Sequence, residues 1–331
     1  MCQQQEQPAS PHQDGLGLSR RSFLRNSGAA VTGMAAAVAA LSPLLELDAD
    51  DIPTVDAFIQ KHYKEMNEGE MQQALARISA KVAERYDIEP NLRDIRPKEG
   101  VEFVYALNLS RCIGCRKCVY ACVEENNQSR SPQVQYIRVL EMPTGTLDIE
   151  AGNHEYEKPT VPDGDHFYMP IQCHQCADPP CTKVCPVEAT WTESDGITVI
   201  DYDWCIGCRY CEAACPYWAR RFNFNEPDLA PGPEGDVNPN MSYLSNRPRE
   251  KGVMEKCHFC LHRTREGGQP ACLEVCPVGA RKFGNVLDPE SEVSEILRNK
   301  RVFVLKEDVG TLPRFFYYFD ERYPRAAGEQ D

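Results

Sequence analysis

The sequence lacks an excess of positive charge and a long apolar segment. Its 331 residues include 36 Lys and Arg against 50 Asp and Glu, which gives a formal charge of −14. A duplex-binding protein needs a surplus of Lys and Arg on one face, so binding of nucleic acid is disfavoured. The only long apolar run, about residues 28–45, is short for a bilayer span and rich in Ala and Gly. We therefore expect no membrane span in the mature chain, and any membrane attachment must come from a partner.

A catalytic constellation is also missing. No residues are spaced as a general base with its nucleophile, or as an open metal position that would process a substrate. The hydrophobic content of 42% is nevertheless enough to bury a core, and the length allows two domains. The sequence thus indicates a globular protein that is not an enzyme by itself.

The N-terminal segment, residues 1–45, resembles a twin-arginine export signal. Arg20 and Arg21 are followed by Phe23 and Leu24 and then by a weakly apolar, Ala-rich stretch. A chance Arg pair ahead of an ordinary helix is the alternative. The twin-arginine route carries proteins that are already folded with their cofactors installed, and it would place this protein on the periplasmic side.

The 17 cysteines are the most informative residues. Cys2 lies ahead of the signal and has no partner in the pattern, so we expect it to be idle. The other sixteen form four groups of four: Cys112, Cys115, Cys118 and Cys122; Cys173, Cys176, Cys181 and Cys185; Cys205, Cys208, Cys211 and Cys215; and Cys257, Cys260, Cys272 and Cys276.

Three chemistries compete for these groups. Disulfides explain an even number, but they give no reason for the repeated spacing, and cysteines so close in sequence are poorly placed to bridge one another. Zinc takes four thiolates in two separated pairs, so a third cysteine after two more residues is surplus. An iron-sulfur cubane fits better, because three thiolates at i, i+3 and i+6 can hold one cube while the fourth reaches a neighbouring cube. Such clusters are built in the reducing cytoplasm, which agrees with an export route for folded proteins.

The cysteine groups repeat internally. Groups one and three share Cys-Ile-Gly-Cys-Arg, whereas groups two and four share Cys-His-x-Cys and a closing Cys-x-x-Val-Cys-Pro-Val. The chain is therefore a duplicated two-motif unit. Spacing alone permits two arrangements: group one with two and three with four, or group one with four and two with three.

These motifs resemble the four-cluster iron-sulfur subunits of molybdopterin oxidoreductase complexes, over about residues 103–320. Such subunits accompany dimethyl sulfoxide, polysulfide, tetrathionate and nitrate reductases and formate dehydrogenase, and a related subunit serves formate-dependent nitrite reduction. The resemblance implies an α+β fold of two ferredoxin-like lobes, a duplicated dicluster ferredoxin. Groups one and four would form lobe one, residues 101–143 with 252–285, and groups two and three would form lobe two, residues 165–224.

The resemblance also implies the ligand sets of four [4Fe-4S] clusters. The nitrate-reductase branch replaces a group-three cysteine with Trp and carries a three-iron cluster, but group three is complete here. We therefore expect no three-iron centre and no open iron that would bind a substrate. The implied sets are Cys112, Cys115, Cys118 and Cys276; Cys257, Cys260, Cys272 and Cys122; Cys173, Cys176, Cys181 and Cys215; and Cys205, Cys208, Cys211 and Cys185.

The implied function is electron transfer within a respiratory complex. The chain would relay single electrons between a catalytic molybdopterin or multihaem cytochrome subunit and a polytopic, quinone-binding membrane subunit. A free-standing periplasmic polyferredoxin with no fixed partner is the alternative. Segments outside the cysteine core favour a permanent subunit.

A helical preface, residues 46–100, precedes group one. An apolar stripe at helical spacing predicts an amphipathic helix that packs over one lobe, and a docking role for a partner is the alternative. A shorter helix is expected before it, with Val55, Phe58, Ile59 and Tyr63 on one side. The stripe consists of Met71, Leu75, Ile78, Val82 and Tyr86.

The remaining segments are read from composition. Residues 225–251 are rich in Pro, Gly and Asn and predict a surface insertion. In the C-terminal segment, residues 286–331, Asp288 and Pro289 predict a helix start, and a strand and an aromatic tail at 315–318 should cover the core. Strand-like runs cover 103–110, 134–142, 166–173 and 197–202.

Basic residues crowd the cysteine motifs of this acidic chain. Positive charge beside a cube stabilises its reduced form, although such side chains can equally reach solvent. His174 and His258 follow the first cysteine of their groups, and either donate to sulfur or only repeat the duplication. Aromatic residues at 204, 210, 217 and 218 are expected to pack around the clusters. The basic residues are Arg111, Arg116, Lys117, Arg209, Arg220, Arg221, Lys256, Arg263, Arg281 and Lys282.

Overall fold

The computed structural model describes residues 61–156, 161–229 and 236–320. All of these belong to one unit of the chain, Lys61–Asp331. The expected export signal, the idle Cys2 and most of the first preface helix lie outside the described residues. No helix in the described ranges combines the length and the apolar character needed to cross a bilayer.

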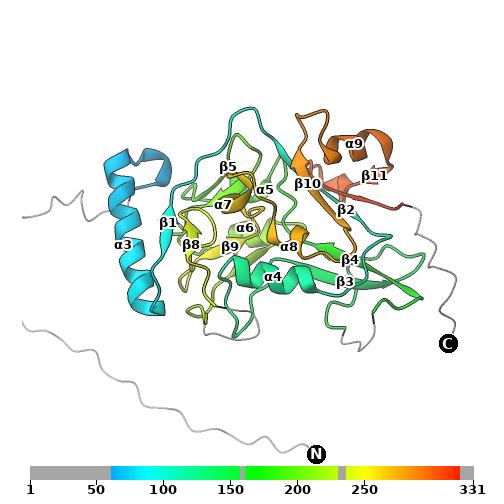
Figure 1. Ribbon diagram of the computed structural model, residues 1–331, viewed down its shortest axis with the longest axis horizontal. Helices are drawn as coiled ribbons and strands as arrows, with labels where there is room; N and C mark the ends of the chain where they lie inside the picture. The colour runs from blue at the N-terminus through cyan, green and yellow to red at the C-terminus, as the bar shows by residue number, and fades with distance from the viewer. Residues whose placement is uncertain (1–60, 157–160, 230–235, 321–331) are drawn as a thin grey trace, which may run out of the picture. The chain divides into compact units, whose positions relative to one another are not determined.

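The largest sheet joins the strand before the first cysteine group to strands near the end of the described chain. Strand β2 (Phe103–Asn108) is buried along its whole length. It pairs antiparallel with β10 (Arg281–Asn285) and parallel with β12 (Phe315–Tyr318), which in turn pairs with β11 (Val302–Phe303). Figure 1 shows β10, in orange, beside β2. The sheet therefore brings the segment before group one next to the segment after group four.

Four two-stranded sheets and a set of short helices complete the fold. The sheets are β1 (Asn91–Arg93) with β8 (Asn240–Ser242), β3 (Arg138–Pro143) with β4 (His166–Ile171), β5 (Thr190–Thr192) with β6 (Thr198–Ile200), and β7 (Arg220–Phe222) with β9 (Met254–Lys256). The helices of the cysteine motifs are α4 (Lys117–Glu125), α5 (Pro180–Lys183), α6 (Tyr210–Ala213), α7 (Leu261–Thr264) and α8 (Ala271–Glu274). Short helices and small sheets in alternation confirm the α+β fold class.

The preface contains the predicted amphipathic helix, α3 (Glu68–Tyr86), after a short 3-10 turn (Tyr63–Glu65). Asn67 caps α3 through a capping box with Glu70, and Asp87 ends it in the left-handed conformation. The predicted stripe is buried apart from Tyr86, which packs against the core. The polar side of α3 makes ion pairs with the rest of the chain, among them Arg77 with Asp203 at 3.0 Å. The helix therefore packs on the cysteine core, as predicted.

The predicted surface insertion is wrong for residues 241–249, which are buried. Arg249 explains why this irregular segment tolerates burial. Its guanidinium donates to the Glu255 carboxylate at 2.6 Å and to the Asn126 carbonyl at 2.6 Å. Side-chain hydrogen bonds replace the water that a loop backbone otherwise needs.

The C-terminal helix starts later than predicted. Helix α9 (Glu292–Asn299) is capped by Ser291, whose hydroxyl accepts from the Ser294 amide at 3.2 Å. Asp288 instead accepts from the Glu290 amide in the preceding turn, so the predicted start at Asp288 and Pro289 is wrong. The aromatic tail forms β12 and is largely buried, which agrees with a core role.

Candidate functional site

The loops at the start of cysteine groups one and three have the same backbone conformation. Gly114 and Gly207 have φ values of +72° and +68°, and the following Arg116 and Arg209 are also left-handed, at 59° and 61°. The helices α4 and α6 begin directly after these arginines. A side chain at Gly207 would meet the Gly252 carbonyl oxygen at 2.0 Å. Glycine is therefore required where the loop passes close to its neighbour.

Two cavities are each lined by four thiols. The first lies between group one and the end of group four, and the second lies between group three and the end of group two. Each cavity combines three thiols of one loop with one thiol from a distant loop. We call the thiols of the first cavity set 1 and those of the second set 4: Cys112, Cys115, Cys118 and Cys276 form set 1, and Cys185, Cys205, Cys208 and Cys211 form set 4.

The remaining eight thiols gather in two further sets. Burial raises the pKa of Cys122 well above its ordinary value, and its thiolate neighbours Cys257, Cys260 and Cys272 raise it further. Burial likewise raises the pKa of Cys176 to about 12, with added effects from neighbouring thiolates. We call these groups set 2, Cys122, Cys257, Cys260 and Cys272, and set 3, Cys173, Cys176, Cys181 and Cys215.

The chemistry of these donors fits an iron-sulfur cluster. All sixteen described cysteines in the four groups have free thiols. Burial and mutual repulsion disfavour ionisation of crowded thiols, whereas a bound metal deprotonates the thiols that coordinate it. Soft thiolate ligands select iron-sulfur clusters, copper(I) or zinc. The four sets can thus hold metal clusters through sulfur donors.

The four sets form a row. Burial raises the pKa of Cys118 in set 1, and Cys272 of set 2 adds to the rise. Cys257 of set 2 is similarly affected by Cys173 of set 3. Burial raises the pKa of Cys211 in set 4 to about 11, with a contribution from Cys181 of set 3. Contacts give the same order, 1, 2, 3, 4. Arg281 reaches Cys118 of set 1 and Cys272 of set 2, and Gln175 in the set 3 loop donates to the Cys257 carbonyl at 2.8 Å. Arg220 donates to Cys181 of set 3 and lines the cavity of set 4.

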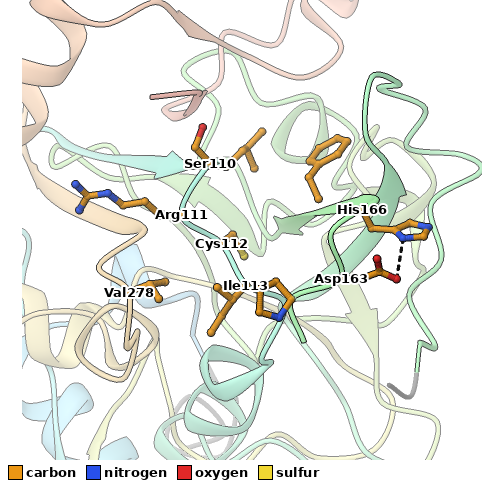
Figure 2. Close-up of a pocket in the computed structure, with 10 residues that line it drawn as sticks. Ser110, Arg111, Cys112, Ile113, Asp163, His166 and Val278 are labelled. Carbon is orange, nitrogen blue, oxygen red and sulfur yellow. Dashed lines mark ion pairs between the residues drawn. The ribbon is translucent and has the colours of Figure 1, made fainter. Parts of the chain in front are cut away.

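Set 1 adjoins an open cavity of about 360 Å³. Figure 2 shows Cys112 and Ile113 on one side of this cavity, with Asp163 and His166 on another. The His166 ring lies 3.2 Å from the Asp163 carboxylate, as the dashed line marks. The cavity brings solvent or a partner group close to the first thiol of group one.

Set 4 reaches the surface at the other end of the row. Cys208 is exposed. Three large apolar side chains around it are exposed by more than half, namely Ile206 at 62%, Tyr210 at 64% and Phe224 at 62%. The expectation that Tyr210 packs around a cluster is therefore wrong. An exposed apolar surface of this kind is typical of a protein interface.

A few polar side chains donate to sulfur. Arg281 donates to Cys118 at 3.3 Å, and Arg220 donates to Cys181 at 2.9 Å. Gln128 donates to Cys122 at 3.2 Å. Gln128 was not identified from the sequence, because it lies outside the cysteine motifs and no spacing rule marks it.

Most of the other predicted basic residues have different partners. Arg263 pairs with Glu274 at 2.6 Å and Lys282 with Glu292 at 2.5 Å, both partly exposed. The two predicted histidines contact hydroxyl groups: His174 lies 3.2 Å from the Tyr317 hydroxyl, and His258 lies 3.1 Å from that of Ser245. The Nδ1 atom of His174 is buried without a hydrogen-bond partner among the described residues, so donation to a cluster sulfur stays a prediction for His174.

Comparison with protein families identifies the same region. Two models described as 4Fe-4S dicluster domains match, one over residues 111–189 and one over 164–229 and 242–286. Together these matches contain all sixteen cysteines of the four groups. The matches favour iron-sulfur clusters over structural zinc or disulfides.

Named relatives are components of reductases. A selenate reductase subunit of Mesobacillus selenatarsenatis is 37% identical over 309 residues, which cover 90% of this chain and 96% of that one. An iron-sulfur subunit of the putative dimethyl sulfoxide reductase of Halobacterium salinarum is 42% identical over 223 residues, covering 66% and 79% of the two chains. A tetrathionate reductase subunit of Salmonella typhimurium is 31% identical over 235 residues, covering 70% and 78%.

Proposed function

The chain belongs to the 4Fe-4S dicluster family of iron-sulfur electron-transfer subunits of respiratory oxidoreductases, and on that premise we propose that it relays single electrons along four [4Fe-4S] clusters. Members of this family are not the catalytic subunits of their complexes. The observation that carries the proposal is the pair of cavities lined by four thiols each. The proposed ligands are the sixteen thiols of sets 1 to 4.

The chain's own residues hold the clusters, separate them and shield them from water. A four-thiolate cubane supplies one-electron redox chemistry when bound. Each set takes its fourth thiol from a different loop than the first three, so the two loops of a lobe are locked together by shared cofactors. Side chains that contact two neighbouring sets, as Arg281 contacts sets 1 and 2, support transfer along the row. Because all four thiols of a set would bind one cube, no iron would have an open position for a substrate. This agrees with a role in electron transfer alone.

The two ends of the row are the proposed contact points for partners. The cavity beside Cys112 and the exposed apolar surface around Cys208 lie at opposite ends of the sequence of sets. One end would face a catalytic molybdopterin or multihaem cytochrome subunit, and the other a polytopic quinone-binding membrane subunit. Relatives that are named as subunits of reductases support a fixed complex over a free polyferredoxin carrier.

Export by the twin-arginine route is part of the proposal. The Arg20 and Arg21 pair with the Ala-rich run supports it. The protein would then act on the periplasmic side, attached to the membrane through its partners. A fusion of residues 1–45 to a folded reporter tests this: periplasmic reporter that is lost on Arg20→Lys with Arg21→Lys supports the route, and unchanged export contradicts it.

Iron and sulfide analysis tests the cluster count. The full chain, purified or reconstituted without oxygen, should contain about sixteen irons and sixteen sulfides, four of each per cubane. A value near eight would mean that only two sets are loaded, and tightly bound zinc would contradict the proposal. Size exclusion after mild detergent extraction separates a permanent subunit, which elutes with larger chains, from a free carrier.

A further inference from the structure

A buried cation separates sets 1 and 2. Arg281 lies on β10 and is 3% exposed. One terminal nitrogen of its guanidinium donates to Cys118 of set 1 at 3.3 Å, and the other lies 3.7 Å from Cys272 of set 2. The second nitrogen also donates to the Gln172 side chain at 2.8 Å, which fixes its position. The charge of Arg281 therefore lies between two sets and contacts both.

Lobe two has an equivalent arginine. Arg220 lies on β7, five residues after the last cysteine of group three, as Arg281 lies five residues after the last cysteine of group four. It donates to Cys181 of set 3 at 2.9 Å and lines the cavity of set 4 together with Cys211. Its other terminal nitrogen is buried without a hydrogen-bond partner. This nitrogen is the donor that a cluster sulfide would satisfy.

A buried lysine occupies the remaining gap, between sets 2 and 3. Lys256 is 1% exposed and lies opposite Arg220 in the pairing of β9 with β7. Its ammonium donates to the carbonyl of Cys257 in set 2 at 2.7 Å and to the Gln175 side chain at 3.4 Å. Gln175 stands between the first two cysteines of set 3. Each of the three gaps in the row thus contains one buried cation.

We propose that Arg281, Lys256 and Arg220 set the redox potentials of the clusters in neighbouring pairs, one cation for each step of the row. The inference depends on the proposed four-cluster function. A positive charge in a gap stabilises an added electron on either side, and because the cation is buried its effect is screened much less than at the surface. Both clusters of a pair rise in potential together, so the electron is not trapped on one of them.

Redox titration of single variants, followed by electron paramagnetic resonance on the full chain, tests this inference. In Arg281→Gln, two of the four clusters should show about a tenfold lower ratio of reduced to oxidised form at a fixed potential. For one electron this corresponds to a redox potential that is lower by about 59 mV. In Arg220→Gln, the other two clusters should shift. In Lys256→Gln, one cluster from each of these pairs should shift. This pattern requires no prior assignment of signals to sets.

Lys282→Gln is the matched control. Lys282 is the next residue on β10, but its side chain pairs with Glu292 and remains partly exposed. The Lys282→Gln variant should leave all four clusters near their wild-type potentials. Arg281→Lys keeps the positive charge and should shift the potentials less than Arg281→Gln does.

Three results would overturn the inference: a shift confined to one cluster, an equal shift of all four, or a shift in Lys282→Gln as large as in Arg281→Gln. Loss of iron from both arginine-to-glutamine variants would also overturn it, since the arginines would then be structural. The iron content of the wild-type chain, measured first, tests the four-cluster function separately.

Discussion

Arg265 is a buried ion-pair centre that joins the two expected lobes. It follows α7 in group four, and its partners Asp195 and Glu193 lie in the β5–β6 turn of lobe two. Its guanidinium donates to Asp195 at 2.7 Å, to Glu193 at 2.5 Å and to the Ile95 carbonyl at 2.8 Å. The Arg265 and Asp195 side chains are both 0% exposed. Replacement by Met leaves two buried carboxylates without their cation, which costs about 3–5 kcal/mol of stability.

Thermal unfolding of the loaded chain measures this loss. One kcal/mol corresponds to roughly 2–4 °C in a domain of this size, so Arg265→Met should lower the unfolding temperature by roughly 6–20 °C. Scans at one heating rate are required, because unfolding with loss of cofactor is irreversible. Arg263→Met is the control, since Arg263 pairs with Glu274 at a partly exposed position worth at most about 1 kcal/mol. Similar shifts in the two variants would refute the reasoning.

Two further predictions concern set 4. Gly207→Ala should remove the cluster of set 4, because the new methyl group would meet the Gly252 carbonyl oxygen at 2.0 Å. The control is Gly279→Ala: Gly279 is also left-handed but has no atom within 4 Å of the added methyl group, so this variant should lose only about 1–2 kcal/mol of stability and keep all iron. Equal iron loss in both variants would contradict the prediction. Cys208→Ser and Cys185→Ser should abolish the same paramagnetic signal and spare the signals of lobe one, and different signals lost in the two variants would disprove the proposed set.

The sequence predicted the elements that depend on local pattern. The apolar stripe of α3 and the strand at Phe103–Asn108 have clear periodicity or continuous apolar character, and both are present. The cysteine spacing indicated cubane ligands, since three thiols on one loop are a local feature. The predicted helix start at Asp288 was wrong because Ser291, three residues later, is an equally good N-cap residue and caps α9 instead.

Features that depend on distant contacts could not be predicted from spacing or composition alone. Spacing allowed two pairings of the cysteine groups, and only the meeting of β2 with β10 brings group one beside group four. The segment at 241–249 has the composition of a loop, and its burial depends on partners more than a hundred residues away, such as Asn126. Of ten basic residues near the motifs, only the fold distinguishes Arg220 and Arg281, which contact sulfur, from the buried Lys256 and from partly exposed residues such as Arg263 and Lys282.

The nesting of one lobe within the other imposes an order on maturation. Sets 3 and 4 are complete within residues 173–215, whereas sets 1 and 2 need thiols from both sides of that segment. As the ribosome releases the chain from its N-terminus, all eight thiols of sets 3 and 4 emerge before β10 and β12 are available to pair with β2. The outer lobe can therefore close only after nearly all of the described chain has been synthesised.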